Sequence, residues 1–497
     1  MKTQKLFVLL LWGLAATAAF AADIVDRPEK LQFPPLKFDP PNPADYRVVL
    51  KSGPVAYLVP DHQLPLVHVS IRVRTGEYME PENKTGVAGA MGYLLGHGGT
   101  KSKTAEQLEE RLAFLAARLY SGVGSTSGNV DLDLLSKDLN EGLEILREVL
   151  TEPRFQDDKL ALFKEQMMQG IRKRNDNSSN IEGFESSILA YGEKFWDNRF
   201  TTAASIESLT KADLQEFHKK WFAPGNFIVA VSGDFNRDEM IGKLDTLFSN
   251  WPFKGETATA IPTNTAFAKP GVYLVNKDVN QGRVSMMLPG IMRDDPDYYA
   301  VAVMNNILGG GGFTSHIMNR VRSDEGLAYS AGSSFPGGTY YPLVFRAGFQ
   351  SKSRTVAYAI SIVIEEINKM INAPVAEAEV NTAKHAFIDS FPRAFETKGQ
   401  IAETFANDEF TGRFAKNPEY WKNYRANIEK VTAADVQRVA KRFLHPEQLA
   451  ILVVGQKDEI LKSYPDHNVS LTSFSTNGVT ELPLRDPLTM KPLPLTK

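Results

Sequence analysis

Apolar and polar residues follow two different periods along the chain. Over residues 47–73 (RVVLKSGPVAYLVPDHQLPLVHVSIRV) they alternate, with turn-forming residues at Ser52-Gly53-Pro54 and Pro60-Asp61, which predicts a pair of half-buried strands. A later apolar run, FIVAVSGD at 227–234, predicts a closing strand. Between them two leucine stripes predict two helices: Leu108, Leu112, Leu115 and Leu119, then Leu139, Leu143, Leu146 and Leu150. Thr104 and Gln107 have the spacing of a capping box before the first helix. This order of elements predicts an α+β fold, in which helices pack on a largely antiparallel sheet.

The same order of elements occurs twice. The segment 212–233 (ADLQEFHKKWFAPGNFIVAVSG) aligns without a gap on 434–455 (ADVQRVAKRFLHPEQLAILVVG). Shorter matches pair AYLVP with VYLVN, and LLGHGGT with ILGGGGFT. Repeats of this length are domain-sized, so we predict two homologous domains, at 45–250 and 272–460, that arose by duplication. The Pro/Thr/Gly-rich segment 251–271 is predicted to link them.

The two ends of the chain differ from these domains. Residues 1–21 combine two lysines, a short apolar run and the small-residue site Ala19-Phe20-Ala21, which predicts a cleavable secretory signal peptide. No cysteine follows it, and no other apolar stretch is long enough to span a bilayer. We therefore expect a periplasmic protein without a lipid anchor or an integral membrane segment. Residues 22–44 and 461–497 are proline-rich and are predicted to be extended arms.

Composition narrows the possible partners. Apolar residues make up 43% and charged residues 23% of the chain, as in an ordinary globular protein. A formal charge of −3 gives no reason to expect a nucleic acid or an anionic membrane surface. Because the chain has no cysteine, its stability must come from buried cores rather than from disulfides.

The segment 86–100 (GVAGAMGYLLGHGGT) has the outline of a metal-binding helix with its polar positions blank. With the duplicated α+β halves, it resembles the insulinase/pitrilysin family of zinc peptidases, the inverzincins, over nearly all of the two domains. Active members carry H-x-x-E-H between a Gly-Leu-Ala lead and a Gly-Thr end. Gly86-Val87-Ala88 and Gly99-Thr100 match these flanks, with one extra residue. The resemblance implies that the two domains together form one half of a clam-shell.

The resemblance places the catalytic positions on residues that cannot perform the chemistry. The two ligand histidines fall on Gly89 and Tyr93, the general-base glutamate on Gly92, and the third ligand, a glutamate, on Gln169. A catalytic zinc needs about three nitrogen or oxygen ligands and an open position for water, and the glutamate must take a proton from that water. We therefore expect no zinc site and no cofactor in this chain.

Nothing else in the sequence replaces that site. The eight histidines include no H-x-x-E-H, H-E-x-x-H or H-x-x-x-H spacing, and His62, His68 and His97 are interpreted as structural. The GGGG run at 309–312 is no phosphate loop, because no G-K-[ST] follows it.

One part of the family's site is kept in the second half. In RSDEGLAYSAGSSF (322–335), Arg322 and Tyr329 have the family's spacing within a Gly-Leu-x-Tyr segment. The resemblance implies that both side chains bind substrate near the scissile carbonyl, as donors to a developing oxyanion. Taken alone, the two residues could be an exposed arginine at a helix end and a tyrosine packed under a loop. With the flanking motif intact, we favour the catalytic interpretation.

Two further segments are candidate substrate contacts. Gly309, Gly310 and Gly311 correspond to a glycine-rich turn that can touch peptide in non-catalytic family subunits. Residues 121–135, with Ser125 and Thr126, occupy the place of the family's edge strand, which pairs with an extended substrate by strand addition. An ordinary hairpin edge explains this segment nearly as well.

Two hypotheses follow for function. In the first, the chain is an exported non-catalytic subunit, inactive alone, that lends Arg322 and Tyr329 to a zinc-bearing partner chain of the same family. The heterodimer would be a metalloendopeptidase acting on extended peptides or unfolded proteins. In the second, the chain is a non-enzymatic scaffold or peptide-binding protein. The retained Arg322/Tyr329 pair argues against this hypothesis, because a pure scaffold has no need of it. A third, a peptidase with an unrecognised site, has no residues to support it.

Overall fold

The computed structural model describes residues 27, 30–31, 37–462 and 464–495, so the signal peptide predicted for residues 1–21 lies outside the described part of the chain. The described residues fall into two units, divided between Asp39 and Pro40. The described part of the first includes a turn in which the Lys30 amide donates to the Arg27 carbonyl. The second unit carries both predicted domains.

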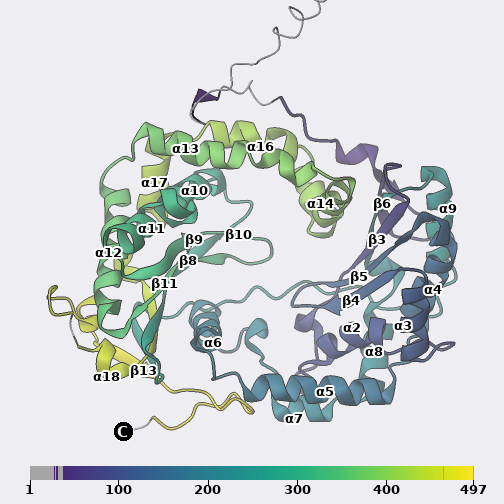
Figure 1. Cartoon of the computed structure of the whole chain (residues 1–497), viewed down its shortest axis with the longest axis horizontal. Coiled ribbons are helices and arrows are strands. Elements are labelled where there is room, and N and C mark those ends of the chain that lie inside the picture. Colours follow the sequence, from purple (N-terminus) through teal and green to yellow (C-terminus); the bar gives the residue numbers. More distant parts are fainter. Residues whose placement is uncertain (1–26, 28–29, 32–36, 463, 496–497) are drawn as a thin grey trace, which may run out of the picture. The chain divides into compact units, whose positions relative to one another are not determined.

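The first half of the larger unit is a six-stranded sheet with helices packed against it (Figure 1). The strand order is β1-β2-β6-β3-β5-β4; β2 and β6 run parallel, and the other neighbours are antiparallel. The strands are β1 (Arg47–Val49), β2 (Val55–Pro60), β3 (Leu66–Val73), β4 (Arg118–Val123), β5 (Gly128–Leu135) and β6 (Phe227–Gly233). The helices are α2 (Val87–His97), α3 (Ala105–Phe114), α4 (Leu139–Thr151), α5 (Asp157–Arg172), α6 (Ser178–Tyr191), α7 (Ala203–Ser208), α8 (Lys211–Trp221) and α9 (Arg237–Phe248).

Strand β3 shows how the alternating pattern builds the layers. Its valines and Ile71 are buried in the core with apolar residues of α2, while His68, Ser70 and Arg72 alternate with them on the other face. The predicted strand pair corresponds to β2 and β3, but β6 lies between them in the sheet. The first core therefore joins strands from both ends of the first half.

The helix predictions are confirmed with one exception. The Thr104–Gln107 capping box is present, with reciprocal hydrogen bonds of 2.9 and 3.3 Å. The first leucine stripe, however, ends early: α3 stops at Phe114, and Leu119 lies in β4. The prediction for Leu119 was wrong, because Ala116 adopts a left-handed backbone conformation (φ 49°) that ends the helical path.

The second half repeats this architecture. Its sheet has the order β13-β7-β12-β8-β11-β9, with β10 beside β8. The strands are β7 (Gly271–Asn276), β8 (Gln281–Met292), β9 (Ala328–Ser334), β10 (Gly337–Gly338), β11 (Leu343–Lys352), β12 (Ala450–Gly455) and β13 (Val479–Leu482). The α-helices are α10 (Tyr298–Asn305), α11 (His316–Met318), α12 (Val356–Asn372), α13 (Glu377–Ile388), α14 (Lys398–Phe410), α15 (Arg413–Lys416), α16 (Tyr420–Glu429), α17 (Ala433–Phe443) and α18 (Lys457–Ile460). Two π-helical segments, η8 (Asn306–Gly310) and η10 (Asn319–Asp324), flank α11.

The two sheets have matching topologies. Strands β2, β6, β3, β5 and β4 of the first sheet follow one another in the same order as β7, β12, β8, β11 and β9 of the second. The parallel pair β2/β6 also has its counterpart in β7/β12. The fold is therefore α+β with two homologous domains, as the sequence predicts.

The halves exchange one helix each. Helix α14 of the second half packs on β2, β6 and β3 of the first sheet, and α6 of the first half packs on β8 and β12 of the second. Ile181 and Leu189 of α6 share a buried cluster with Met287 and with residues of β12. Glu409 of α14 accepts hydrogen bonds from Arg47 (3.0 and 3.1 Å) and from Tyr57 (2.9 Å). Each sheet is thus covered in part by the other half.

The C-terminal arm adds to both halves. Its β13 pairs in parallel with β7 at the edge of the second sheet. Further on, Arg485 donates to the buried carboxylate of Glu185 at 2.7 Å, and the Ala203 amide donates to the Leu488 carbonyl. Within the described part of the chain, no helix combines the length and apolar character needed to cross a bilayer.

Candidate functional site

Helix α2 carries three of the four degenerate catalytic positions. Its N-terminus is held by Glu80, a buried carboxylate that accepts hydrogen bonds from the amides of Gly86 (3.0 Å) and Ala88 (2.8 Å). Burial raises the pKa of Glu80 to about 7, although the two backbone donors oppose this. A carboxylate at this end also complements the helix dipole.

Gly92, at the position of the general base, lies directly against the edge strand β4. A Cβ at this glycine would stand 2.4 Å from the Val123 nitrogen and 2.7 Å from the Gly122 carbonyl carbon. Ser121 fastens the contact, since its hydroxyl donates to the Gly92 carbonyl at 2.6 Å and accepts from the Gly96 amide at 2.8 Å. The backbone of β4 therefore fills the space that a glutamate side chain would need.

The two ligand-histidine positions also hold no metal-binding group. Gly89 faces open space, because a Cβ there would meet no atom within 4 Å. Tyr93 instead forms an aromatic stack, with ring centroids 4.3 Å from His97 and 5.4 Å from Phe163 of α5. The Nδ1 atom of His97 lies 2.9 Å from the Tyr93 carbonyl, so His97 has a packing and hydrogen-bonding role at the helix end.

The fourth position, Gln169, lies near the end of α5 and is exposed. Its side-chain amide donates to Glu165 one turn earlier, at 3.3 Å. Among the described residues, the group of His, Asp and Glu side chains spaced to hold a metal lies elsewhere, at His68, Asp131 and Glu403. Sequence reasoning missed this group, because Glu403 comes from the opposite half of the chain.

Arg322 and Tyr329 are brought together in the second half. Arg322 lies in the π-helical segment η10, and Tyr329 lies in β9, at the edge of the sheet. The guanidinium carbon stands 4.6 Å from the Tyr329 ring centroid and 4.6 Å from that of Phe313. Tyr329 is 85% exposed and Phe313 is 64% exposed. The arginine is thus held between two aromatic rings, and Phe313 is a neighbour that the motif spacing did not single out.

A cavity of about 610 Å³ opens beside Tyr329. Its lining comes from β8, β9 and β11, from Gly326 and Leu327 just before β9, and from Glu182 of α6. Arg346 in its wall is paired with Glu182 (3.5 Å) and donates to Ser186 (2.8 Å), while Arg283 donates to Gln350 (3.1 Å). The space next to Tyr329 therefore offers amide and guanidinium donors, which suit carbonyl and carboxylate oxygens of a peptide.

The remaining candidates lie at two turns. Gly309 is buried against β9, where a Cβ would stand 2.4 Å from the Ser333 nitrogen, and Gly310 and Gly311 approach Asn305 and Asn306 closely. Packing alone thus accounts for these glycines, and their contact with substrate stays a prediction. Ser125 and Thr126 form the turn between β4 and β5. Their contact with substrate also stays a prediction.

Two family profiles match this chain. The profile described as "Insulinase (Peptidase family M16)" matches residues 56–185, and that described as "Peptidase M16 inactive domain" matches residues 208–387. Together they span more than half of the chain.

Individual relatives are distant but similar over most of their length. The chain is 20% identical over 416 residues to a probable mitochondrial-processing peptidase subunit beta of Arabidopsis thaliana, covering 80% of this chain and 75% of that one. It is 24% identical over 405 residues to the non-peptidase homolog YmxG of Helicobacter pylori, covering 80% and 90%. A solved structure titled as a peptidase M16 inactive domain, from Pseudomonas fluorescens, superposes with a TM-score of 0.73 at 23% identity, covering 84% and 98%.

The chain belongs to the insulinase family, peptidase family M16. It is an inactive homologue within that family, since the H-x-x-E-H residues are replaced and β4 occupies the space of the general base.

Proposed function

We propose that this chain is an exported, non-catalytic subunit of a heteromeric insulinase-like zinc peptidase. It would supply Arg322 and Tyr329 to a peptide whose scissile bond is held at the zinc of a partner chain of the same family. The predicted signal peptide favours a periplasmic complex. One relative is named as a subunit of the mitochondrial-processing peptidase and another as a non-peptidase homolog, and both descriptions are compatible with this role.

The observation that carries the proposal is the exposed Arg322–Tyr329 pair. Leaving an aromatic ring 85% exposed forgoes the stabilisation of burying it, which is about 1.5–3 kcal/mol for a large apolar side chain. Packing therefore does not explain why Tyr329 is a tyrosine. An exposed phenol whose ring lies against a guanidinium, at the rim of a cavity with arginine and amide side chains in its wall, has the chemistry needed to stabilise a developing oxyanion.

Substitution of Tyr329 in the assembled complex tests the proposal. Tyr329→Phe removes one hydroxyl and keeps the ring over Arg322, so folding and assembly should be unchanged. Because the lost contact is made mainly in the transition state, kcat should fall by on the order of 10²-fold with little change in KM. Arg322→Ala should lower kcat/KM with a larger share in KM, since the guanidinium also holds the ground-state peptide.

The control is Tyr273→Phe, which also deletes one hydroxyl from the second half. Tyr273 lies on β7, away from β9 in the sheet, and its hydroxyl donates to the Lys269 carbonyl just before that strand. Normal assembly and a wild-type rate with Tyr329→Phe would leave the chain as a scaffold or peptide-binding protein.

A further inference from the structure

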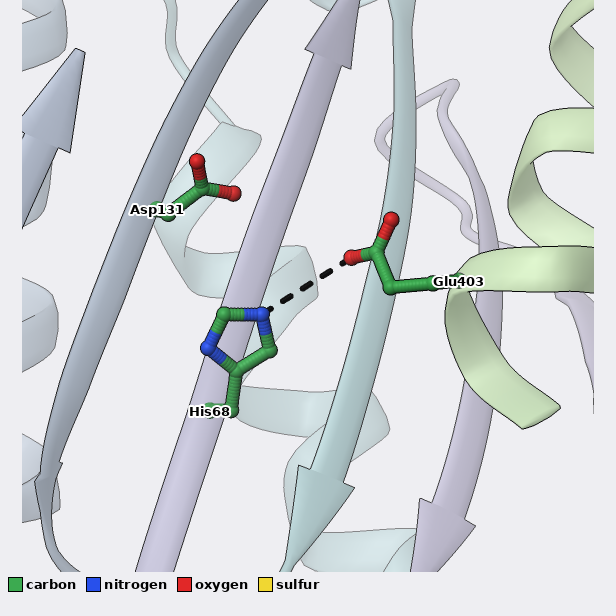
Figure 2. Close-up of side chains that lie close together, drawn as sticks. All are labelled: His68, Asp131 and Glu403. Atoms are coloured by element: carbon green, nitrogen blue, oxygen red, sulfur yellow. Dashed lines mark ion pairs between the residues drawn. The ribbon is translucent and has the colours of Figure 1, made fainter. Parts of the chain in front are cut away.

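Three side chains of metal-binding type meet where α14 crosses the first sheet. His68 lies on β3, Asp131 on β5 and Glu403 on α14. Each offers one ligand atom, and these atoms all lie within 4.8 Å of one another. Figure 2 shows the imidazole of His68 between the two carboxylates.

The fold explains why the three converge. Along β3 the apolar residues face the core, so His68 and Arg72 point to the other face, which α14 covers. On β5, Asp131 and Asp133 are spaced two residues apart and therefore share one face of the sheet; they pair in register with Ser70 and His68. Helix α14 then brings a carboxylate from the second half onto this polar face.

His68 is oriented by a carboxylate. Its Nδ1 atom lies 2.8 Å from Asp133 Oδ1, which leaves Nε2 facing Glu403 Oε1 at 3.7 Å, the pair joined by the dashed line in Figure 2. A metal-binding histidine is commonly held in this way, with one ring nitrogen donating to a carboxylate and the other directed at the ion.

The carboxylate oxygens leave room for a ligand. Glu403 Oε1 is buried and has no hydrogen-bond partner among the described residues, while its Oε2 is paired with Arg72 at 2.9 Å. Asp131 Oδ2 accepts from Asn129 at 2.6 Å. Counting Asp133, the cluster holds three carboxylates against the guanidinium of Arg72 and the imidazole of His68. The acidic groups outnumber the basic ones, which favours a cation.

We propose that His68, Asp131 and Glu403 form a binding site for a divalent transition metal of the zinc type. The ligand set is one imidazole and two carboxylates, which zinc accepts. Two ligand atoms at zinc bond lengths lie about 3.3 Å apart in a tetrahedral site. The 3.7 Å between His68 Nε2 and Glu403 Oε1 therefore needs little adjustment. The site is separate from the degenerate catalytic positions, so this proposal departs from the expectation, drawn from those positions alone, that the chain holds no zinc. Because its ligands come from both halves, the bound metal joins α14 to the first sheet.

Calorimetric titration of zinc chloride into the untagged, metal-free full chain tests this. We expect one zinc per chain with micromolar or tighter affinity. Asp131→Asn and Glu403→Gln keep the shape of the side chain and each remove the charge of one ligand, so each should weaken zinc binding at least tenfold. Asp133→Asn should weaken zinc binding by about 10–100-fold, because Asp133 orients His68. The control is His62→Asn, because exposed His62 also pairs with a carboxylate, Asp234, but belongs to no three-ligand group within the part of the chain that the structure describes. This variant should bind zinc as the wild type does.

A second measurement guards against variants that fold poorly. At one fixed zinc concentration, zinc should raise the melting temperature of the wild type and of His62→Asn by the same amount, since a ligand that binds the native state stabilises it. The rise should be smaller for Asp131→Asn, because its affinity for zinc is weaker. Absence of binding in the micromolar range, or binding that survives both ligand substitutions, would overturn the proposal. The cluster would then be an ion-pair network in which a protonated His68 bridges Asp133 and Glu403. No peptidase partner is needed for any of these measurements, so the result is independent of the proposed function.

Discussion

Two glycines three residues apart on α2 meet very different surroundings. Gly89 faces open space, whereas Gly92 lies against the backbone of β4. Both correspond to catalytic side chains in active members of the family, yet only the second is required by packing. The packing thus leaves room for a side chain at position 89 and leaves none at position 92, where the helix contacts an edge strand.

This difference predicts opposite effects of the same substitution. Gly92→Ala forces a methyl group into the β4 backbone and should lower the free energy of unfolding by about 1–3 kcal/mol. Gly89→Ala meets nothing and should raise it by about 0.5–1 kcal/mol, the helix-propensity gain of alanine over glycine. Urea unfolding of the two variants measures both values. Equal effects at the two positions would mean that α2 and β4 are not in close contact.

At the scale of single elements, much of the fold could be predicted from local patterns. The alternation in β3, the Thr104–Gln107 box and the leucines of α4 are each decided by neighbours in sequence. The end of α3 was missed because it depends on the backbone at Ala116. The approach of β4 to Gly92 and the meeting of Glu403 with His68 depend on tertiary packing between distant segments, which no local pattern reports.

Helix α2 is also an element with a titratable cap. The pKa of Glu80 is about 7 in the folded chain and about 4.3 in an unfolded one. Between these values the folded state keeps a proton that the unfolded state has lost, so this group makes stability fall as pH rises from about 4.3 to 7. Above pH 7 the cost is fully present.

Glu80→Gln should remove this contribution, because glutamine still accepts from the Gly86 and Ala88 amides but does not ionise. We therefore expect the stability of the variant, relative to the wild type, to increase between pH 5 and pH 8 in urea unfolding. Glu82→Gln is the control for the loss of one carboxylate, since Glu82 lies two residues away and is exposed. The pH-dependent gain in stability should be larger for Glu80→Gln than for Glu82→Gln. A Glu80→Gln variant with the wild-type pH slope would show that the carboxylate stays ionised when buried.

At the scale of the whole unit of residues 40–497, the exchange of α6 and α14 makes each half incomplete without the other. Helix α14 covers the first sheet. It accepts hydrogen bonds from three arginines of the first half, Arg47, Arg72 and Arg74. The second sheet is covered by α6, and β13 and Arg485 tie the arm to both halves. The two halves should therefore stay together without the covalent link between them.

Cutting the linker tests this directly. A protease site inserted between Thr263 and Asn264, both exposed and in a stretch without regular structure, should be cleaved without disturbing either sheet. We expect the two fragments to elute as one species in gel filtration and to unfold in a single calorimetric transition, because the buried faces of α6 and α14 remain with the opposite sheet. An insertion at the same place that lacks the protease site serves as the control for the added residues. Fragments that separated without denaturant, or that melted in two transitions, would show that the exchanged helices contribute little to holding the halves together. The covalent link through residues 251–271 would then be what keeps them associated.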